Sequence, residues 1–258
     1  MATEFNKIAL SLHAHPDDAE AWNAGVLKLL KDRGYKIIIA TITAGQMGGC
    51  DMNMQETARV REKEAKNAAS VLDAEYYCLG GEDGFLFDTR EMRLNVISLM
   101  RRVNAGVVFT HLPCDYHSDH RITANIVESA AMISSLDPVP VDEPPLKVTP
   151  LLYHTSPLTL SDPLGSRIAE PHFYVDVSSA IETKRRMLEY HLSQQDLMRH
   201  MHKMSDFFGY VLQGNKDYGK DVNVEYAEVY WQHMGGGFQK EQQIQRDLAD
   251  FIITNKSN

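Results

Sequence analysis

Apolar runs of strand length alternate along the chain with segments whose apolar residues recur at helical spacing. The run at 35–45 is rich in isoleucine and threonine and predicts a buried strand. In 20–34, Trp22, Val26 and Leu30 lie four residues apart and a glycine closes the segment, which predicts one helix. The same patterns predict strands at 7–14, 74–80, 105–111, 151–155 and 172–178, and helices at 56–73, 89–104, 121–133 and 179–198.

This alternation predicts an α/β fold: a mostly parallel sheet with helices on both faces. No linker divides the chain, so we expect one domain over 1–258. The proline-rich segment 134–150 predicts a long loop, either a lid or simple packing. The C-terminal segment 244–256 predicts a helix that docks on the body or on a neighbouring subunit, which would suit a homo-oligomer. Its apolar stripe consists of Ile244, Leu248, Phe251 and Ile252.

Composition narrows the functional classes. The 258 residues are 43% hydrophobic, enough for one large core, and the formal net charge of −9 argues against nucleic acid or an anionic membrane as a partner. The three cysteines form no CxxC pair, which favours a reducing compartment. No stretch approaches the ~20 apolar residues of a membrane span. We therefore expect a soluble, cytoplasmic protein.

The loop after the first predicted strand reads HAHPDDAE, residues 13–20, where a glycine-rich sequence is common. Ligands of open α/β sheets bind at the carboxyl ends of the strands, so this loop lines the expected crevice. Glycine-rich loops offer backbone N–H groups to an anion, whereas carboxylates and neutral imidazoles attract a cation. The residue types therefore indicate part of a metal site.

A second cluster, THLPCDYHSDHRIT at 110–123, follows another predicted strand and opens into the same crevice if the sheet is parallel. His117 and His120 are three residues apart, which places both on one side of a helical turn. Together the two loops offer His15, Asp18 and His120 as ligands of one ion. Three protein ligands with an open fourth position are typical of catalytic zinc.

Spacing alone leaves other interpretations open. The adjacent carboxylates Asp17 and Asp18 would also complement the dipole of a helix N-terminus. Two histidines and one carboxylate also form the facial triad of non-haem iron enzymes, so Fe²⁺ or another divalent metal would suit the same ligands. That triad is more typical of an all-β barrel than of this alternation. The residue types by themselves leave the choice of divalent metal open.

The motifs AHPDDAE at 14–20 and HSDH at 117–120 resemble those of the PIG-L/LmbE-like family of zinc-dependent N-deacetylases. Segments 60–84, 174–194 and 226–230 resemble later parts of that family less specifically, so the resemblance covers most of the chain. It implies a Rossmann-like α/β fold and one Zn²⁺ per chain as the expected cofactor. It also implies hydrolysis of an N-acetyl or related N-acyl amide by a zinc-bound water, on a glucosamine-type sugar or glycoconjugate.

The resemblance also implies individual roles. His15, Asp18 and His120 match the metal ligands, Asp17 matches the general base, and His117 matches the histidine that assists the oxyanion and the leaving group. A proline before the two aspartates favours an extended chain, in which successive side chains point apart. We therefore expect only one of the two carboxylates to face the ion.

Four further positions correspond to the family's pattern less directly. Asp119 matches a carboxylate that orients a histidine, and Arg61 matches a substrate-contacting arginine, although a solvated helix face would also explain Arg61. Some family members carry a tyrosine where this chain has Asp115, with Tyr116 one residue later. The sequence assigns neither residue a role.

Two alternative functions use the same scaffold: an amidase acting on a thiol or other conjugate, and a non-catalytic sugar- or metal-binding module. Retention of Asp17 and His117 beside the ligands speaks against the module, because binding alone requires neither. A nucleotide-binding protein is disfavoured, because no GxGxxG follows the first strand. The glycines at 45–49 predict a flexible active-site loop. We expect specificity to lie in loops 45–56, 81–90 and 134–170, which do not reveal the substrate.

Overall fold

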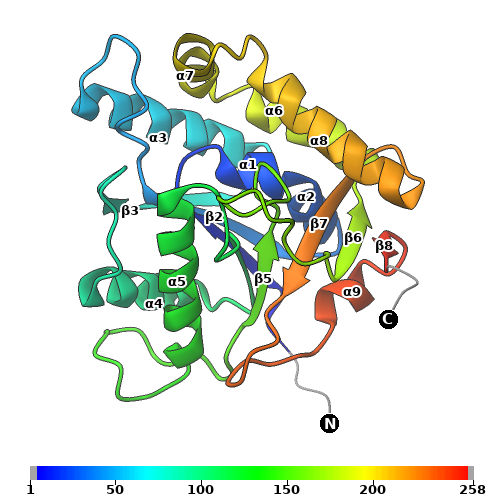
Figure 1. Ribbon diagram of the computed structural model, residues 1–258. Coiled ribbons are helices and arrows are strands. Elements are labelled where there is room, and N and C mark those ends of the chain that lie inside the picture. Colours follow the sequence, from blue (N-terminus) through cyan, green and yellow to red (C-terminus); the bar gives the residue numbers. More distant parts are fainter. Residues whose placement is uncertain (1–4, 255–258) are drawn as a thin grey trace.

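The computed structural model describes residues 5–254, and within them eight strands form one sheet in the order β3-β2-β1-β4-β5-β7-β6-β8 (Figure 1). β1 to β5 run parallel to one another, whereas β7 is antiparallel to both β5 and β6, and β8 is antiparallel to β6. The predicted mostly parallel sheet is therefore confirmed. The strands are β1 Ile8–His13, β2 Lys36–Thr43, β3 Glu75–Gly81, β4 Val107–Thr110, β5 Leu151–Thr155, β6 Phe173–Asp176, β7 Ala227–Gln232 and β8 Ile252–Ile253.

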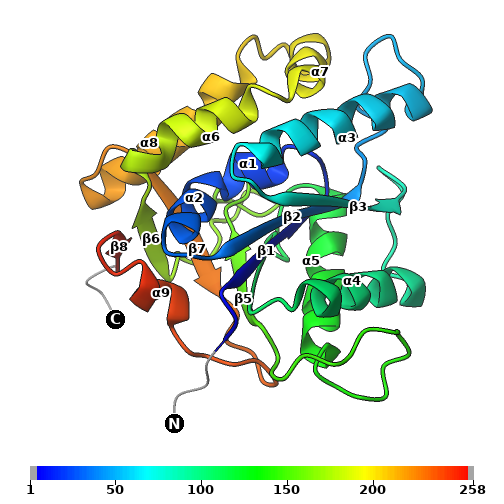
Figure 2. The same cartoon turned by 180° about the vertical axis from the view of Figure 1, so that it is seen from behind.

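Helices cover both faces of the sheet, as predicted. α2, α3 and α6 pack on one face, and α4 and α5 on the other (Figure 2). No helix in the described part of the chain is long and apolar enough to cross a membrane. The helices are α1 Asp18–Trp22, α2 Ala24–Asp32, α3 Met54–Ser70, α4 Arg90–Val103, α5 Ser118–Ile133, α6 Ile181–Leu188, α7 Leu192–His202, α8 Phe207–Val222 and α9 Gln243–Asp247, with a short 3₁₀ turn at Ser178–Ala180.

The central strands are apolar on both sides because both sides are buried. On β1, Ala9 joins the core that includes Leu27 of α2, while Leu10 and Leu12 join the core that includes Val96 of α4. Successive strand side chains point to opposite faces, so a continuous apolar run satisfies both cores.

The predicted helix 20–34 is wrong as a single element, because the chain breaks at Asn23 between α1 and α2. The hydroxyl of Tyr230 donates to Asn23 Oδ1 at 2.7 Å. The carboxylate of Glu228 accepts from two backbone N–H groups in the first turn of α2, each at 2.9 Å. Partners from a distant strand thus satisfy the new helix start.

The predicted helix 179–198 is also divided, into the 3₁₀ turn, α6 and α7, and α8 was not predicted. The predicted C-terminal helix is wrong beyond its first turns. Within its described part, up to residue 254, only α9 is helical, and Ile252 instead pairs with Val175 at the edge of the sheet. Ile244 and Leu248 are buried, while Phe251 and Ile252 are half-buried. Residues 255 and 256 of that prediction lie outside the described residues.

The loop 134–150 packs against the body and is not a lid. It leads into the amino end of β5, whereas the metal motifs follow the carboxyl ends of β1 and β4. The loop and the motifs therefore lie at opposite ends of these parallel strands. The guanidinium of Arg101 donates to the backbone carbonyls of Ser134, Leu136 and Glu143, at 2.6–3.0 Å. One buried arginine therefore holds the loop in place.

Candidate metal and catalytic site

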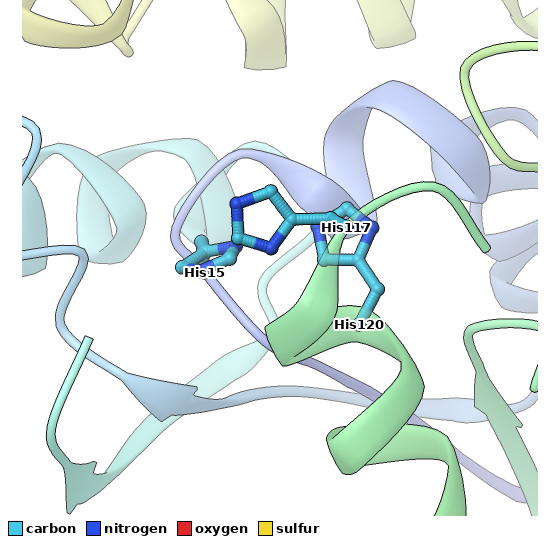
Figure 3. A group of neighbouring side chains, drawn as sticks. All are labelled: His15, His117 and His120. Carbon is cyan, nitrogen blue, oxygen red and sulfur yellow. The ribbon is translucent and has the colours of Figure 1, made fainter. Parts of the chain in front are cut away.

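Both metal motifs lie at the carboxyl ends of β1 and β4, which are adjacent in the sheet. From β1 the chain passes to β2 on one side, and from β4 it passes to β5 on the other. This reversal is a topological switch point, where the two loops diverge and leave a crevice. Figure 3 shows His15 from the loop after β1 beside His117 and His120 at the start of α5.

The expectation of an extended chain at the paired aspartates is wrong. Asp17 precedes α1 with a φ of 99°, in a region that non-glycine residues seldom adopt. Such strained conformations are concentrated at functional sites. The two carboxylates nevertheless have different partners: Asp17 faces Arg61, and Asp18 faces histidines.

Asp18 lies at the centre of the polar cluster. Its Oδ2 is 3.4 Å from His15 Nδ1 and 3.3 Å from His111 Nε2, and its Oδ1 is 3.4 Å from His120 Nε2. Burial alone would raise the pKa of the Asp18 carboxyl, but His120 and His111 hold that pKa well below its usual range. Asp18 is therefore ionised and ready to bind a cation.

Asp115, to which the sequence assigned no role, orients His120. Nδ1 of His120 donates to Asp115 Oδ1 at 3.0 Å, so Nε2 turns toward Asp18. The same oxygen accepts from the backbone N–H of His117 at 2.9 Å. A carboxylate behind a histidine is the usual support of a metal ligand, because it fixes which ring nitrogen carries the proton.

His117 begins α5 as its N-cap residue. Its Nδ1 accepts from the backbone N–H of Asp119 at 3.2 Å. Nδ1 can accept only when it is unprotonated, so the neutral ring carries its proton on Nε2. Burial lowers the pKa of His117, and the nearby rings of His120 and His15 lower it further. The ring is therefore neutral and presents an N–H donor.

Two carboxylates lie on the other side of His15. Its Nε2 is 3.1 Å from Asp83 Oδ1 and 3.4 Å from Asp119 Oδ2. Asp119 also accepts from the backbone N–H of Gly84 at 2.7 Å. The carboxylate of Asp119 therefore contacts His15. Asp83, the other carboxylate beside this histidine, was not identified from the sequence.

Arg61 is buried, which rules out the solvated helix face. From α3, its Nη2 donates to the carbonyl of Pro16 at 2.8 Å and to Asp17 Oδ1 at 3.2 Å, and its Nη1 donates to the carbonyl of Gly45 at 3.1 Å. Burial raises the pKa of the Asp17 carboxyl to about 7, although the charge of Arg61 opposes this.

The donor atoms suit a divalent metal ion. Within residues 5–254, three overlapping groups hold their ligand atoms within 4.8 Å of one another, and the group of Asp18, His111 and His120 is fully buried. The other groups are His15, His117 and His120, and His15, Asp83 and Asp119. Nε2 of His111 already accepts from the backbone N–H of Ala14 at 3.0 Å, so this histidine is less available as a ligand. Imidazole nitrogens with a carboxylate oxygen suit zinc or iron.

A cavity of about 280 Å³ opens over these residues. His15, Asp17, His117 and His120 lie on its polar side, together with Arg61. Apolar side chains from α1, α7, α8 and residue 158 also line this cavity. They are Trp22, Leu158, Leu197, Met198 and Phe207.

Comparison with known proteins connects this geometry to a family. Residues 10–131 match the family model of PIG-L, described as GlcNAc-PI de-N-acetylase. The chain is 28% identical over 194 residues to diacetylchitobiose deacetylase of Thermococcus kodakarensis, covering 73% of this chain and 70% of that protein.

Solved structures share the fold. N,N'-diacetylchitobiose deacetylase from Pyrococcus horikoshii is 24% identical, with a TM-score of 0.74 over 88% of this chain and 84% of that one. GalB, the 4-carboxy-2-hydroxymuconate hydratase of Pseudomonas putida KT2440, is 19% identical, with a TM-score of 0.72 over 91% and 99% of the two chains. Since the second is a hydratase, the fold alone does not define the reaction. Both motifs lie within residues 10–131, just under half of the chain, and this part of the chain is similar to the PIG-L family, whose model is described as GlcNAc-PI de-N-acetylase.

Proposed function

We propose that this protein is a metal-dependent hydrolase that removes an N-acetyl group from a glucosamine-type sugar or glycoconjugate. One observation carries the proposal: Asp17, held by Arg61, and His117, with its Nε2 carrying the proton, line the same cavity as His15, Asp18 and His120. The similarity to a diacetylchitobiose deacetylase supports N-acetylated sugars as the substrate class.

His15, Asp18 and His120 would hold the metal, with Zn²⁺ as the expected ion. A divalent cation there supplies a Lewis acid that polarises the amide carbonyl and acidifies water. Asp115 supports the site by holding Nδ1 of His120, which leaves Nε2 for the ion.

Asp17 acts as the general base in this proposal and takes a proton from the attacking water. Its carboxylate is separate from the ligand Asp18 and is oriented by Arg61. Neutral His117 donates a hydrogen bond from its Nε2–H to the oxygen that gains negative charge. The leaving nitrogen receives the proton that Asp17 has taken from the water, so Asp17 ends the reaction as a carboxylate again. The products are a free amine and acetate. Arg61 serves as a positioning residue as well as part of the cavity wall.

A screen for free-amine release tests the proposal. Purified, zinc-loaded protein is incubated with a panel of N-acetylated sugars, with chelator-treated protein as the control. Elemental analysis should find about one divalent ion per chain, and chelation should abolish the activity. Full activity in metal-free protein, or no amine release from any member of the panel, would overturn the proposal.

Two further features stay predictions. The cysteine usage favours a cytoplasmic location, which fractionation of cells tests. The second prediction is a homo-oligomer. Because Ile244 and Leu248 are buried within the chain, only part of the expected C-terminal stripe can contact another copy, and the mass of the protein in solution tests this.

A further inference from the structure

A second cavity of about 230 Å³ adjoins the one described above. Trp22, at the end of α1, and Leu158 lie in the walls of both cavities. Each cavity alone is smaller than the roughly 300–1,000 Å³ typical of small-molecule sites, whereas the two together fall within that range. The space for a substrate therefore extends beyond the residues that act on the amide.

The wall of the second cavity combines aromatic rings with polar groups. α8 contributes Tyr210, Gln213, Asn215 and Tyr218. Asn215 is buried, its Nδ2 donates to the carbonyl of Ala227 at 2.9 Å, and its Oδ1 has no hydrogen-bond partner among the described residues. Aromatic faces beside amides and hydroxyls suit a ring that carries hydroxyl groups, because its C–H faces pack on the aromatics and its hydroxyls bond to the polar groups.

The charge of this wall indicates an uncharged ligand. Among residues 5–254, Asp217 is the one charged residue in the lining, and no lysine or arginine of this range lines the cavity. Lys220, from outside the lining, donates to Asp217 Oδ1 at 2.7 Å, and Gln213 Nε2 donates to the same oxygen at 2.9 Å. A carboxylate or phosphate on the ligand would find no cation in the lining and would face a carboxylate.

We propose that this second cavity is a subsite for an uncharged second sugar ring joined to the ring that carries the N-acetyl group. This inference rests on the proposed function and narrows it: the preferred substrate is a neutral disaccharide or longer N-acetylglucosaminide. Free N-acetylglucosamine and acidic conjugates are poorer substrates.

Gly214 provides a sharp test, because it lines the second cavity from the middle of α8. Apart from its chain neighbours and the backbone of α8, no atom of the described residues lies within 4 Å of a Cβ built at this position, so a larger side chain has room there. Gly214→Phe should fill the subsite, while Gly214→Ala also replaces the glycine by a better helix former but adds only a methyl group, and serves as the matched control. Tyr210→Ala removes an exposed ring from the wall, with Tyr190→Ala, an exposed tyrosine outside it, as control.

The experiment measures kcat/KM for amine release from three probes: N-acetylglucosamine, N,N'-diacetylchitobiose, and N-acetylglucosamine linked to glucuronic acid. The wild type should favour the neutral disaccharide by about tenfold over both others. Gly214→Phe should remove this preference, and Tyr210→Ala should reduce it about fivefold, since an aromatic contact is worth roughly that much. Both controls should keep it.

The outcomes separate this inference from the proposed function. Equal kcat/KM for the three probes, or an equal loss on all of them in Gly214→Phe, would overturn the subsite while the deacetylase activity stands. If no probe releases amine, the proposed function fails. Calorimetric binding of N,N'-diacetylchitobiose then decides whether the second cavity is a subsite. Weaker binding to Gly214→Phe than to Gly214→Ala would support the subsite, and equal binding would overturn it.

Discussion

Nη2 of Arg61 lies 3.2 Å from Oδ1 of Asp17, with both side chains buried. The same guanidinium also donates to the carbonyls of Pro16 and Gly45, so one residue of α3 joins the loop after β1 to the loop after β2. The strained backbone of Asp17 is thus held from a residue far along the chain.

Arg61→Lys should lower kcat by about 10²-fold without changing the metal content. A lysine ammonium lacks the planar fork that reaches three acceptors, and a small displacement of a catalytic group can cost about this much. Steady-state kinetics with elemental analysis check this. Arg59→Lys, an exposed change on the same helix, is the control and should have no effect. An Arg61→Lys variant with wild-type kcat would show that Asp17 does not need this contact.

Substitutions at the paired aspartates should separate their roles. Asp17→Asn should keep the metal and lose about 10²–10⁴-fold in turnover, the usual contribution of a general base. Asp18→Ala should lose the metal first, because Asp18 faces three histidines. Excess zinc should partly restore Asp18→Ala and leave Asp17→Asn inactive. Metal lost from Asp17→Asn but retained in Asp18→Ala would show that the two roles are reversed.

Glu228 should contribute strongly to stability. It is buried and accepts from two N–H groups of α2, from the hydroxyl of Tyr230 and from the ammonium of Lys184. Glu228→Ala leaves a buried ammonium unpaired and should lower the free energy of unfolding by about 3–5 kcal/mol. Urea denaturation measures the change. Asp196→Ala breaks the exposed pair with Arg199 and should cost less than about 1 kcal/mol. Similar costs for the two variants would contradict the importance of the buried network.

His154 should make the protein less stable in acid. It is buried, its Nδ1 donates to the carbonyl of His111 at 2.7 Å, and burial lowers its pKa to about 4. Below its unfolded pKa of about 6.5 the unfolded chain binds a proton that the folded protein excludes. Stability should therefore fall as the pH drops from about 6.5 toward 4.

The test compares the wild type with His154→Asn, which can keep the bond to the carbonyl. Between pH 7.5 and 4.5 the variant should lose about 2–3 kcal/mol less in free energy of unfolding than the wild type. Chelator is present throughout, so that metal release does not contribute. The exposed His200→Asn variant is the control. An identical pH dependence of wild type and His154→Asn would refute the role of this histidine.

The sequence by itself determined the class of most elements and the layered α/β fold. Strands such as β1 and β2 are buried on both faces, so their apolar runs can be recognised without knowing their partners. The residues of the two metal motifs were identified for a similar reason. Each motif directly follows a strand, and a parallel sheet brings those strand ends to one edge.

Only the tertiary structure decided where helices break and which residues support the site. The break at Asn23 depends on Tyr230 and Glu228, which lie some 200 residues away, so no local pattern contains it. Asp83 reaches His15 only after β3 takes its place in the sheet. Asp115 is close to His120 in sequence, but its support of that ring depends on how the loop turns before α5. The spacing of apolar residues along the chain indicates which face of an element is buried. Hydrogen bonds between distant segments depend instead on how the elements pack.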